Sequence, residues 1–518
     1  MKISKLLFVL AIVCFGEATA QNFYWISYTP KSTPLNEVET YFSPKAIQNR
    51  IKHNIAWENT DLPLDNDVLA WSKKQGEVIV HSRWLNATLL YTNKSIEALS
   101  SYSKVVKVTP YNNATSATVA SVNNTNINPT VALAKYQTNS LQADTLQTLG
   151  LTGKNIRIAV FDVGFNGVED HIAFQHLYAR NKIIATKDFI RNKENRTKGG
   201  SHGTAVLSCI AGYFGDTRTG LATDAEFLLA RTEHNVREPF AEEAYWLAAA
   251  EWADLNGANI ISSSLGYTYH RYFPADMDGR TSLVARAATM ASKKGILVVN
   301  AMGNDGDNGW HYISTPADAD SVLSVGGIDP YNNTHINFSS YGPNNNGTLK
   351  PNVSAAGYAV CAKPDGNYTH MYGTSFATPL ISGLAACVWQ QHPEFTNMQL
   401  KAYLETKGHL APYFDYAVGY GAPQVFDLKK GVKPKYDLKQ NELRISLDPT
   451  TKQYQGLQSN LHNNNAVYVA INNAEGKLTH YYTYQLSDPV NSIYLPTLPA
   501  GGTIKLSFQG NYETIKIP

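Results

Sequence analysis

The middle of the chain, residues 135–432, alternates short apolar runs with helical runs. The apolar runs are rich in β-branched residues and lie at 156–161, 226–230, 259–262 and 296–299. Helical stretches separate them, for example at 240–256 and 281–294. Near-continuous apolar strands with helices between them are typical of a parallel sheet that is covered on both faces. We therefore expect an α/β domain over this part of the chain.

A different pattern precedes this domain, in residues 21–134. Strand-like, helix-like and strand-like runs follow one another at 78–81, 96–99 and 105–108. Ser43 before Pro44 indicates a helix start, because serine caps the first turn and proline suits the first helical position. The segment closes with an aperiodic linker at 112–130 that is rich in Asn, Thr and Ser. We expect a small α+β module followed by a stretch where cleavage concentrates.

Residues 433–518 change to alternation of apolar and polar positions. The alternating runs lie at 466–471, 492–495 and 503–508, and turn signals such as Gly501-Gly502 separate them. This period of two predicts strands with one buried face each, and several short strands of this kind favour a small β-sandwich.

The first 20 residues have the pattern of a signal peptide. Lys2 and Lys5 supply the positive start, the apolar run 6–15 is too short to span a membrane, and Ala18-Thr19-Ala20 is a small-x-small cleavage site. A lipoprotein signal through Cys14 is the weaker alternative, because bulky Val13 precedes that cysteine. No later apolar run reaches 18 residues, so we expect no membrane span. The protein is predicted to be exported, with a mature chain beginning at Gln21, and to end up secreted, periplasmic or on the cell surface.

Charge and cysteine content narrow the function classes. The 518 residues hold 44 basic and 42 acidic side chains, a net charge of +2, with no charged block long enough to attract a nucleic acid. After loss of the signal, Cys209, Cys361 and Cys387 remain. This odd number excludes a disulfide framework but leaves one disulfide open. Cys209 and Cys387 lie in apolar helix-like runs, so we expect buried thiols.

Three motifs follow one another in the α/β domain. Asp162 ends the apolar strand in IAVFDVG, and ligands of parallel sheets bind beyond the carboxyl ends of strands. His202 opens a helix in HGTAV, although a surface or capping histidine would explain it equally well. Ser375 opens another helix in GTSFATP, where free N–H groups and the helix dipole stabilise an oxyanion. Only this last motif is specific by itself, but the three together indicate nucleophilic catalysis by a serine.

The order Asp, His, Ser on an α/β scaffold resembles the subtilisin family of serine proteases (subtilases), for which this order is known. The resemblance covers residues 153–421. It implies that Asp162 orients the base, His202 is the general base and Ser375 is the nucleophile. It also implies a serine-type endopeptidase that acts on protein or peptide substrates through an acyl-enzyme, requires no cofactor and, we expect, works as a monomer.

Two further stretches resemble the substrate-binding segments of this family. SSSLG at 262–266 is similar to the strand that pairs with the substrate backbone and walls the first specificity pocket. VVNAMGNDG at 298–306 is similar to the oxyanion segment, with Asn304 as the side-chain donor. The substrate-binding residues implied by these matches are Ser264, Leu265, Gly266, Ala301, Met302 and Gly303. An added strand explains why such a site recognises backbone rather than side chains.

Some positions depart from the family pattern. Asn300 and Met302 stand where the family usually has small residues, and Met302 either narrows the pocket or packs inward. Many subtilisins bind calcium, but no ligand run fits well here. Asp305-Gly306-Asp307 and Asp276-Met277-Asp278-Gly279 are turn sequences first, so we assign no metal site and leave structural calcium as an unsupported alternative.

The resemblance also bears on the flanking segments. The family carries an inhibitory propeptide where residues 21–134 lie, so we expect this module to assist folding, block the cleft and be cut within 112–140; a permanent domain is the alternative. The 433–518 domain resembles binding or sorting modules of secreted enzymes only loosely. Three rival functions stay open: a processing protease with few substrates, a catalytically inactive binding protein, and an adhesin in which the C-terminal domain matters most.

Overall fold

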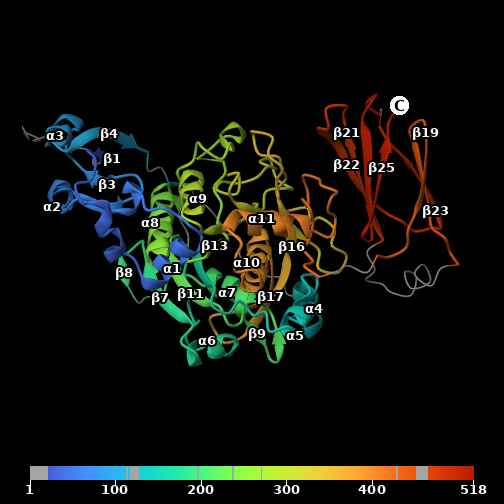
Figure 1. Cartoon of the computed structure of the whole chain (residues 1–518), viewed down its shortest axis with the longest axis horizontal. Coiled ribbons are helices and arrows are strands. Elements are labelled where there is room, and N and C mark those ends of the chain that lie inside the picture. Colours follow the sequence, from blue (N-terminus) through green and yellow to red (C-terminus); the bar gives the residue numbers. More distant parts are fainter. Residues whose placement is uncertain are drawn as a thin grey trace, which may run out of the picture.

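The computed structural model has three parts along the chain (Figure 1). It describes residues 22–112, 115–116, 128–194, 196, 198–235, 238–269, 271–426, 430–450, 465–496 and 498–518. The predicted signal peptide at 1–20 and most of the predicted linker at 112–130 lie outside the described residues. No helix in the described part of the chain is long and apolar enough to cross a bilayer.

The central part is built on one eight-stranded sheet. Its strands, in the order β16-β15-β14-β13-β6-β11-β7-β8, are β16 (Val353–Ala356), β15 (Leu323–Ile328), β14 (Leu297–Ala301), β13 (Ile260–Ser263), β6 (Arg157–Asp162), β11 (Glu226–Arg231), β7 (Ile183–Asp188) and β8 (Lys193–Glu194). All neighbours are parallel except the edge pair β7 and β8. The predicted parallel sheet and its four predicted strands are confirmed.

Helices cover both faces of this sheet, and β6 shows why. Ile158 and Val160 pack with α7 (His202–Ala211) and α10 (Thr374–Gln391) on one face. The alternate residues Ala159 and Phe161 pack with α8 (Ala241–Leu255) and α9 (Leu283–Lys293) on the other. Because successive side chains of a strand point to opposite faces, a strand buried on both sides must be apolar throughout. The predicted helices at 240–256 and 281–294 are therefore confirmed as α8 and α9.

Shorter elements complete the domain. They are α4 (Val131–Asn139), α5 (Ala143–Thr148), α6 (Gln175–Ala179), α11 (Asn397–Thr406), β9 (Tyr213–Phe214), β10 (Thr217–Arg218), β12 (Glu238–Pro239), β17 (Tyr358–Ala362) and β18 (Tyr368–Tyr372). Cys209, Cys361 and Cys387 are buried and free, and the Sγ atoms of Cys209 and Cys361 lie 3.6 Å apart. The expected buried thiols at Cys209 and Cys387 are confirmed.

The N-terminal part is an α+β module, as predicted. Its antiparallel sheet has the order β2-β3-β1-β4, and its elements are β1 (Asn22–Tyr28), α1 (Pro44–Lys52), α2 (Asn66–Gln75), β2 (Glu77–Ser82), β3 (Ala87–Thr92), α3 (Ile96–Ser100) and β4 (Val105–Tyr111). The Ser43 hydroxyl caps α1 by accepting the N–H of Ala46 at 3.2 Å. Val80 and Trp84 join the apolar cluster of α8, so the module packs directly against the central domain.

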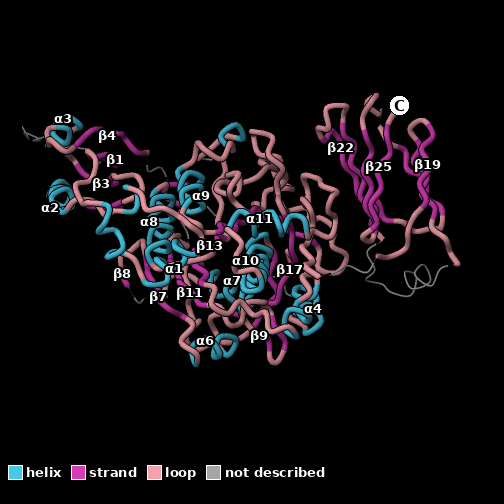
Figure 2. Tube along the Cα trace, viewed as in Figure 1, coloured by secondary structure: helices cyan, strands magenta, loops and turns pink. Residues whose placement is uncertain are grey.

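The C-terminal part is a sandwich of two antiparallel sheets (Figures 1 and 2). The strands are β19 (Lys435–Lys439), β20 (Glu442–Ser446) and β23 (Val490–Tyr494) in one sheet, and β22 (Leu478–Gln485), β21 (Ala466–Asn472), β24 (Thr503–Phe508) and β25 (Asn511–Lys516) in the other. One face of β21 fills the sandwich core through Val467 and Val469. Its other face contacts the central domain, where the Tyr468 hydroxyl donates to the Asn333 carbonyl at 2.9 Å.

Candidate active site

Asp162 is the last residue of β6, near the middle of the sheet. Parallel strands β11 and β13 flank β6, so its carboxylate lies at the edge where their carboxyl ends meet. The side chain is completely buried, and its Oδ1 accepts the N–H of Val163 at 2.8 Å. A buried carboxylate needs hydrogen-bond donors, and most of its remaining acceptor capacity faces one neighbour, His202.

His202 begins α7, and its ring faces Asp162. Nδ1 lies 3.0 Å from both carboxylate oxygens of Asp162. The N–H of Gly203 donates to the carbonyl of Gly164 at 3.1 Å, which holds the start of the helix against the turn after Asp162. A side chain at position 203 would clash with that carbonyl, so the close approach requires glycine. Because Nδ1 of His202 faces a carboxylate, Nδ1 carries the proton, and Nε2 is left as an acceptor.

The pKa of His202 reflects two opposing effects. Burial of the ring lowers the pKa, but the Asp162 carboxylate and its hydrogen bond raise it by more. The net effect is a pKa above the usual histidine value of about 6.5. The site therefore favours a histidine that takes up a proton readily.

Ser375 lies in the first turn of α10 and is nearly buried. Its hydroxyl donates to the carbonyl of Ser264 at 3.4 Å, and the Ser264 hydroxyl donates back to the carbonyl of Ser375 at 2.8 Å. The ring of the next residue, Phe376, lies 5.6 Å from the ring of His202 between centroids. The structure thus brings the start of α10 beside the Asp162–His202 pair, while the Ser375 hydroxyl is turned toward Ser264.

Asn304 lies on the same side of α10. Its Oδ1 accepts the N–H of Thr374 at 2.8 Å and the Thr374 hydroxyl at 2.9 Å. These two donors fix the orientation of the amide, so the two N–H groups of Nδ2 point away from Thr374. Asn304 is exposed.

A model of the family described as "Subtilase family" matches residues 153–421, which is more than half of the chain and contains all of these residues. The chain belongs to the subtilase family. Subtilisin DY of Bacillus licheniformis is 29% identical over 283 residues, covering 54% of this chain and 93% of the relative. The thermostable alkaline protease of Halalkalibacterium halodurans is 31% identical over 255 residues, covering 49% and 62%. The solved structure of sphericase is 26% identical and covers 53% and 93%, with a TM-score of 0.44.

This subtilase is therefore a serine peptidase that acts on protein substrates, and its N-terminal module has a family match of its own. A model described as "Peptidase S8 propeptide domain, Bacteroidota" matches residues 23–128. The module predicted from sequence thus has the position and the fold of a subtilase propeptide.

Two segments diverge beyond the sheet of the subtilase and form the predicted walls of its pocket. On one side, Gly266 is exposed, and within the described part of the chain its N–H and carbonyl make no hydrogen bond. On the other side, Ala301 is buried and Gly303 is half-buried. Met302 is completely buried in a cluster with Met277, Trp310, Ile313 and Ala317, so the inward-packing alternative is the one observed.

Ser314 also belongs to this region, although it lies outside every sequence motif of the site. There is no room for a Cβ atom on Gly266, because the Ser314 hydroxyl lies directly against it. The same hydroxyl would lie 3.3 Å from a Cβ on Gly303. Ser314 thus fills space between the two walls of this subtilase. The one sequence signal near Ser314 is the Thr315-Pro316 pair that follows it, in a loop without helix or strand pattern.

The two Asp-Gly loops considered for calcium are hydrogen-bonded turns. Asp278 accepts the N–H groups of Arg280 and Thr281 at 2.8 Å, and Asp276 accepts the N–H of Phe273 at 2.8 Å. Asp305 accepts the side-chain amide of Asn308 at 2.6 Å. Among the described residues, no group of three or more His, Cys, Asp or Glu side chains is placed to hold a metal ion.

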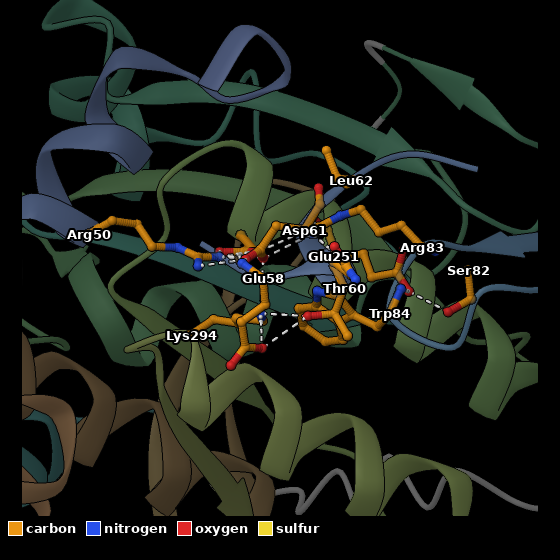
Figure 3. Close-up of polar contacts among 12 residues, drawn as sticks. Arg50, Glu58, Thr60, Asp61, Leu62, Ser82, Arg83, Trp84, Glu251 and Lys294 are labelled. Atoms are coloured by element: carbon orange, nitrogen blue, oxygen red, sulfur yellow. Dashed lines mark hydrogen bonds and ion pairs between the residues drawn. The ribbon is translucent and has the colours of Figure 1, made fainter. Parts of the chain in front are cut away.

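A buried ionic network joins the propeptide-like module to the catalytic domain (Figure 3). Asp254 of α8 accepts from Arg50 at 3.1 Å and from Arg83 at 2.5 Å, and both arginines also contact Asp61. Lys294 reaches Asp61 at 3.0 Å from the catalytic side. Each of these side chains is at most 6% exposed. The module supplies Arg50, Asp61 and Arg83 and the catalytic domain supplies Asp254 and Lys294, so altering either part leaves buried charges of the other unpaired.

Glu251 makes a second set of contacts across the same interface. Its carboxylate accepts the Ser82 hydroxyl at 2.5 Å and the N–H groups of Arg83 and Trp84 at 2.9 and 3.2 Å. Burial raises the pKa of Glu251, and these donors only partly oppose that effect. The turn after β2 is therefore held by three donors on one buried carboxyl group.

Proposed function

We propose that this subtilase is an exported serine endopeptidase in which Asp162, His202 and Ser375 form the catalytic triad. The observation that carries the proposal is the position of His202 Nδ1, 3.0 Å from both oxygens of the buried Asp162 carboxylate, at a helix start beside Ser375. This geometry favours a proton on Nδ1, which leaves Nε2 as the acceptor that the proposed role of base requires. Export rests on the pattern of residues 1–20.

The reaction follows from these positions. Rotation of the Ser375 hydroxyl from the Ser264 carbonyl to Nε2 of His202 places the proton on the base as the oxygen attacks a peptide carbonyl. Asp162 holds the ring and stabilises the imidazolium that forms. Asn304 Nδ2 and the N–H of Ser375 donate to the oxyanion. His202 then gives the proton to the leaving amine as the peptide C–N bond breaks, which leaves the acyl group on Ser375. Water, deprotonated by His202, attacks the acyl group, and the proton returns to the Ser375 oxygen as the acid is released.

Substrate binding is proposed for the two diverging walls. An extended peptide can pair with the N–H and carbonyl of Gly266, which make no other hydrogen bond in the described part of the chain. We assign Ser264, Leu265 and Gly266 to one wall and Ala301, Met302 and Gly303 to the other. The Met302 side chain is turned inward, and its N–H and carbonyl bond to Val325 and Ser314, so Met302 shapes this wall without offering hydrogen bonds to a substrate.

The N-terminal module is proposed to be a propeptide that covers the cleft until it is cut. The tail after β4 forms a short antiparallel pair, β5 (Thr115–Ser116) with β12. β12 ends the segment that follows β11, and the first residue of this segment, Thr232, donates its N–H to the carbonyl of Asp162 at 3.0 Å. This pairing beside the Asp162 end of the sheet supports a tail that lies as an added strand near the cleft and hinders the entry of substrate. Cleavage between 112 and 140 would release it.

Replacement of Asn304 by alanine is expected to lower kcat by about 100- to 1,000-fold, the range for loss of one oxyanion donor. KM should change much less, because the donor acts on charge that develops in the transition state. Steady-state kinetics with a chromogenic tetrapeptide amide give both constants. Asn304→Asp is the matched control, since it keeps the acceptor for Thr374 but offers no donor. Wild-type kcat in either variant would exclude this role.

The raised pKa of His202 predicts the acid limb of the pH profile. The base must be neutral, so activity is present above its pKa and is lost as the pH falls through it. Because this pKa lies above about 6.5, half of the maximal kcat/KM should be reached at a pH above that value. Initial rates at subsaturating substrate across about pH 5 to 10 measure the midpoint. A midpoint below 6.5 would contradict the proposed ion pair.

The proposed function is tested by incubating the purified full-length chain with casein and with a peptide library. An endopeptidase yields internal fragments, and intact-mass analysis of the enzyme over the same period shows whether residues up to the 112–140 region are removed. Inert casein together with an unchanged full-length mass would favour the inactive binding protein instead.

A further inference from the structure

Asn300 is the residue at the fork between the two pocket walls. β13 and β14 pair in parallel up to Ser263 and Asn300, which form the last pair of the ladder. Beyond this pair the chains separate, Ser264–Gly266 to one wall and Ala301–Gly303 to the other. Among the described residues, no residue of the Ser264–Gly266 wall pairs with β14, so the ladder between β13 and β14 ends at Ser263 and Asn300.

The side chain of Asn300 crosses this fork. Its Nδ2 donates to the carbonyl of Leu265 at 2.9 Å and to the carbonyl of Ala301 at 2.9 Å. These two acceptors settle which end of the amide carries the N–H groups. The Asn300 side chain therefore holds one residue of each wall, Leu265 and Ala301.

The remaining supports of the Ser264–Gly266 wall lie at its two ends. At one end Ser264 exchanges hydrogen bonds with Ser375, and at the other Tyr267 pairs with Thr315 through N–H bonds of 3.0 and 3.2 Å. Between these ends, the Asn300 amide makes the bond that holds Leu265. The neighbouring Gly266 is then free to present its backbone groups to a substrate.

The position of Asn300 is unfavourable for stability. The residue is completely buried, and its Oδ1 has no hydrogen-bond partner in the described part of the protein. An unpaired buried acceptor is destabilising, so such a group calls for an explanation other than stability. The hydrogen bond from the Asn300 amide to the Leu265 carbonyl supplies such an explanation.

We propose that Asn300 is a positioning residue that sets the separation of the two walls and thereby the binding of extended peptide chains. This inference rests on the proposed function and deepens it. A substrate that spans several residues makes backbone hydrogen bonds along the Ser264–Gly266 wall, whereas an N-acetyl amino-acid ester places its side chain in the first pocket but makes few of these bonds. Loss of the amide must therefore weaken hydrolysis of long substrates more than that of short ones.

The test compares kcat/KM for a tetrapeptide amide with kcat/KM for an N-acetyl ester of the same terminal residue. In Asn300→Ala the peptide-to-ester ratio is expected to fall about tenfold, the effect of one lost hydrogen bond, chiefly through a higher KM for the peptide. Asn300→Asp has the same shape but, when ionised at alkaline pH, turns an acceptor toward the Leu265 carbonyl, so its ratio should fall at least as far. A wild-type ratio in Asn300→Asp would show that packing alone matters and would overturn the proposal.

Asn397→Ala is the matched control. Asn397 is also buried, and its amide ties the carbonyls of Ser292 and Ile296 at 2.8 and 3.1 Å, away from the pocket walls. This variant should lower the unfolding temperature without changing the peptide-to-ester ratio. If Asn300→Ala behaves like Asn397→Ala, the positioning role is wrong. If the wild type hydrolyses neither substrate, the proposed function itself is wrong, and the two failures are thus distinguishable.

Discussion

Ser375→Ala is expected to lower kcat for peptide hydrolysis on the order of 10⁶-fold, the loss known for removal of the nucleophile in subtilisin itself. Ser375 is the hydroxyl at the start of α10, next to the ring that Asp162 orients, and alanine leaves that base with nothing to activate. Any remaining rate comes from the oxyanion donors and from substrate binding. Turnover of a chromogenic tetrapeptide, with highly concentrated enzyme for the variant, measures the ratio.

The loss must come from chemistry rather than from folding. Among the residues that the structure describes, the Ser375 hydroxyl makes one long hydrogen bond, of 3.4 Å to Ser264, so its removal should leave the unfolding temperature nearly unchanged. Adding His202→Ala to Ser375→Ala should cost little more, because residues that act as a unit are not additive. Substantial peptidase activity in a folded Ser375→Ala protein would mean that another residue is the nucleophile.

Asp162→Asn is expected to lower kcat about 10⁴-fold. The carboxylate now accepts from Nδ1 of His202, but an asparagine in the same place would turn an N–H group toward the ring. The ring would then carry its proton on Nε2 and could not accept the Ser375 proton. The same tetrapeptide assay, near the pH optimum of the wild type, measures the effect.

The pH profile of Asp162→Asn adds an independent check. Without the carboxylate the pKa of His202 should fall, because burial then acts unopposed. The acid limb of the remaining activity should therefore move to lower pH. An Asp162→Asn enzyme with near wild-type kcat and an unmoved acid limb would show that Asp162 is a structural strand-end residue only.

The elements of the central domain could be predicted because burial dictates their composition. β6, β11, β13 and β14 are covered on both faces, so their sequences are continuous apolar runs, and α8 and α9 fill the intervals. The order Asp162, His202, Ser375 was informative for a related reason. Each residue lies directly at the end of a strand or the start of a helix, where the local pattern marks it.

The pocket could be predicted only in part. The position of Ser314 depends on the loop that brings it between Gly266 and Gly303, and a loop has no periodicity that reports its path. The proposed role of Asn300 depends on the carbonyl of Leu265, 35 residues before it in the sequence. The inward turn of Met302 depends equally on Trp310 and Ile313, which follow it in that loop. Sequence analysis could list both alternatives for Met302 but not decide between them.

The interface with the propeptide-like module was also beyond prediction. Arg50, Asp61 and Arg83 would ordinarily lie on a solvated surface, since charged residues are almost never buried unless paired. Asp254, the partner of both arginines, lies 204 residues after Arg50 in the sequence. No local pattern links residues at that separation, so the buried network became evident only in the folded chain.

The most direct test of the account is covalent labelling with a serine-directed phosphonate, followed by mass spectrometry of the digested protein. We expect one adduct per molecule on the peptide that contains Ser375, slower labelling in Asp162→Asn, and none in Ser375→Ala. A tetrapeptide substrate should slow the labelling of the wild type by competition. An adduct on another residue, or equal labelling of wild type and Asp162→Asn, would contradict the proposed triad.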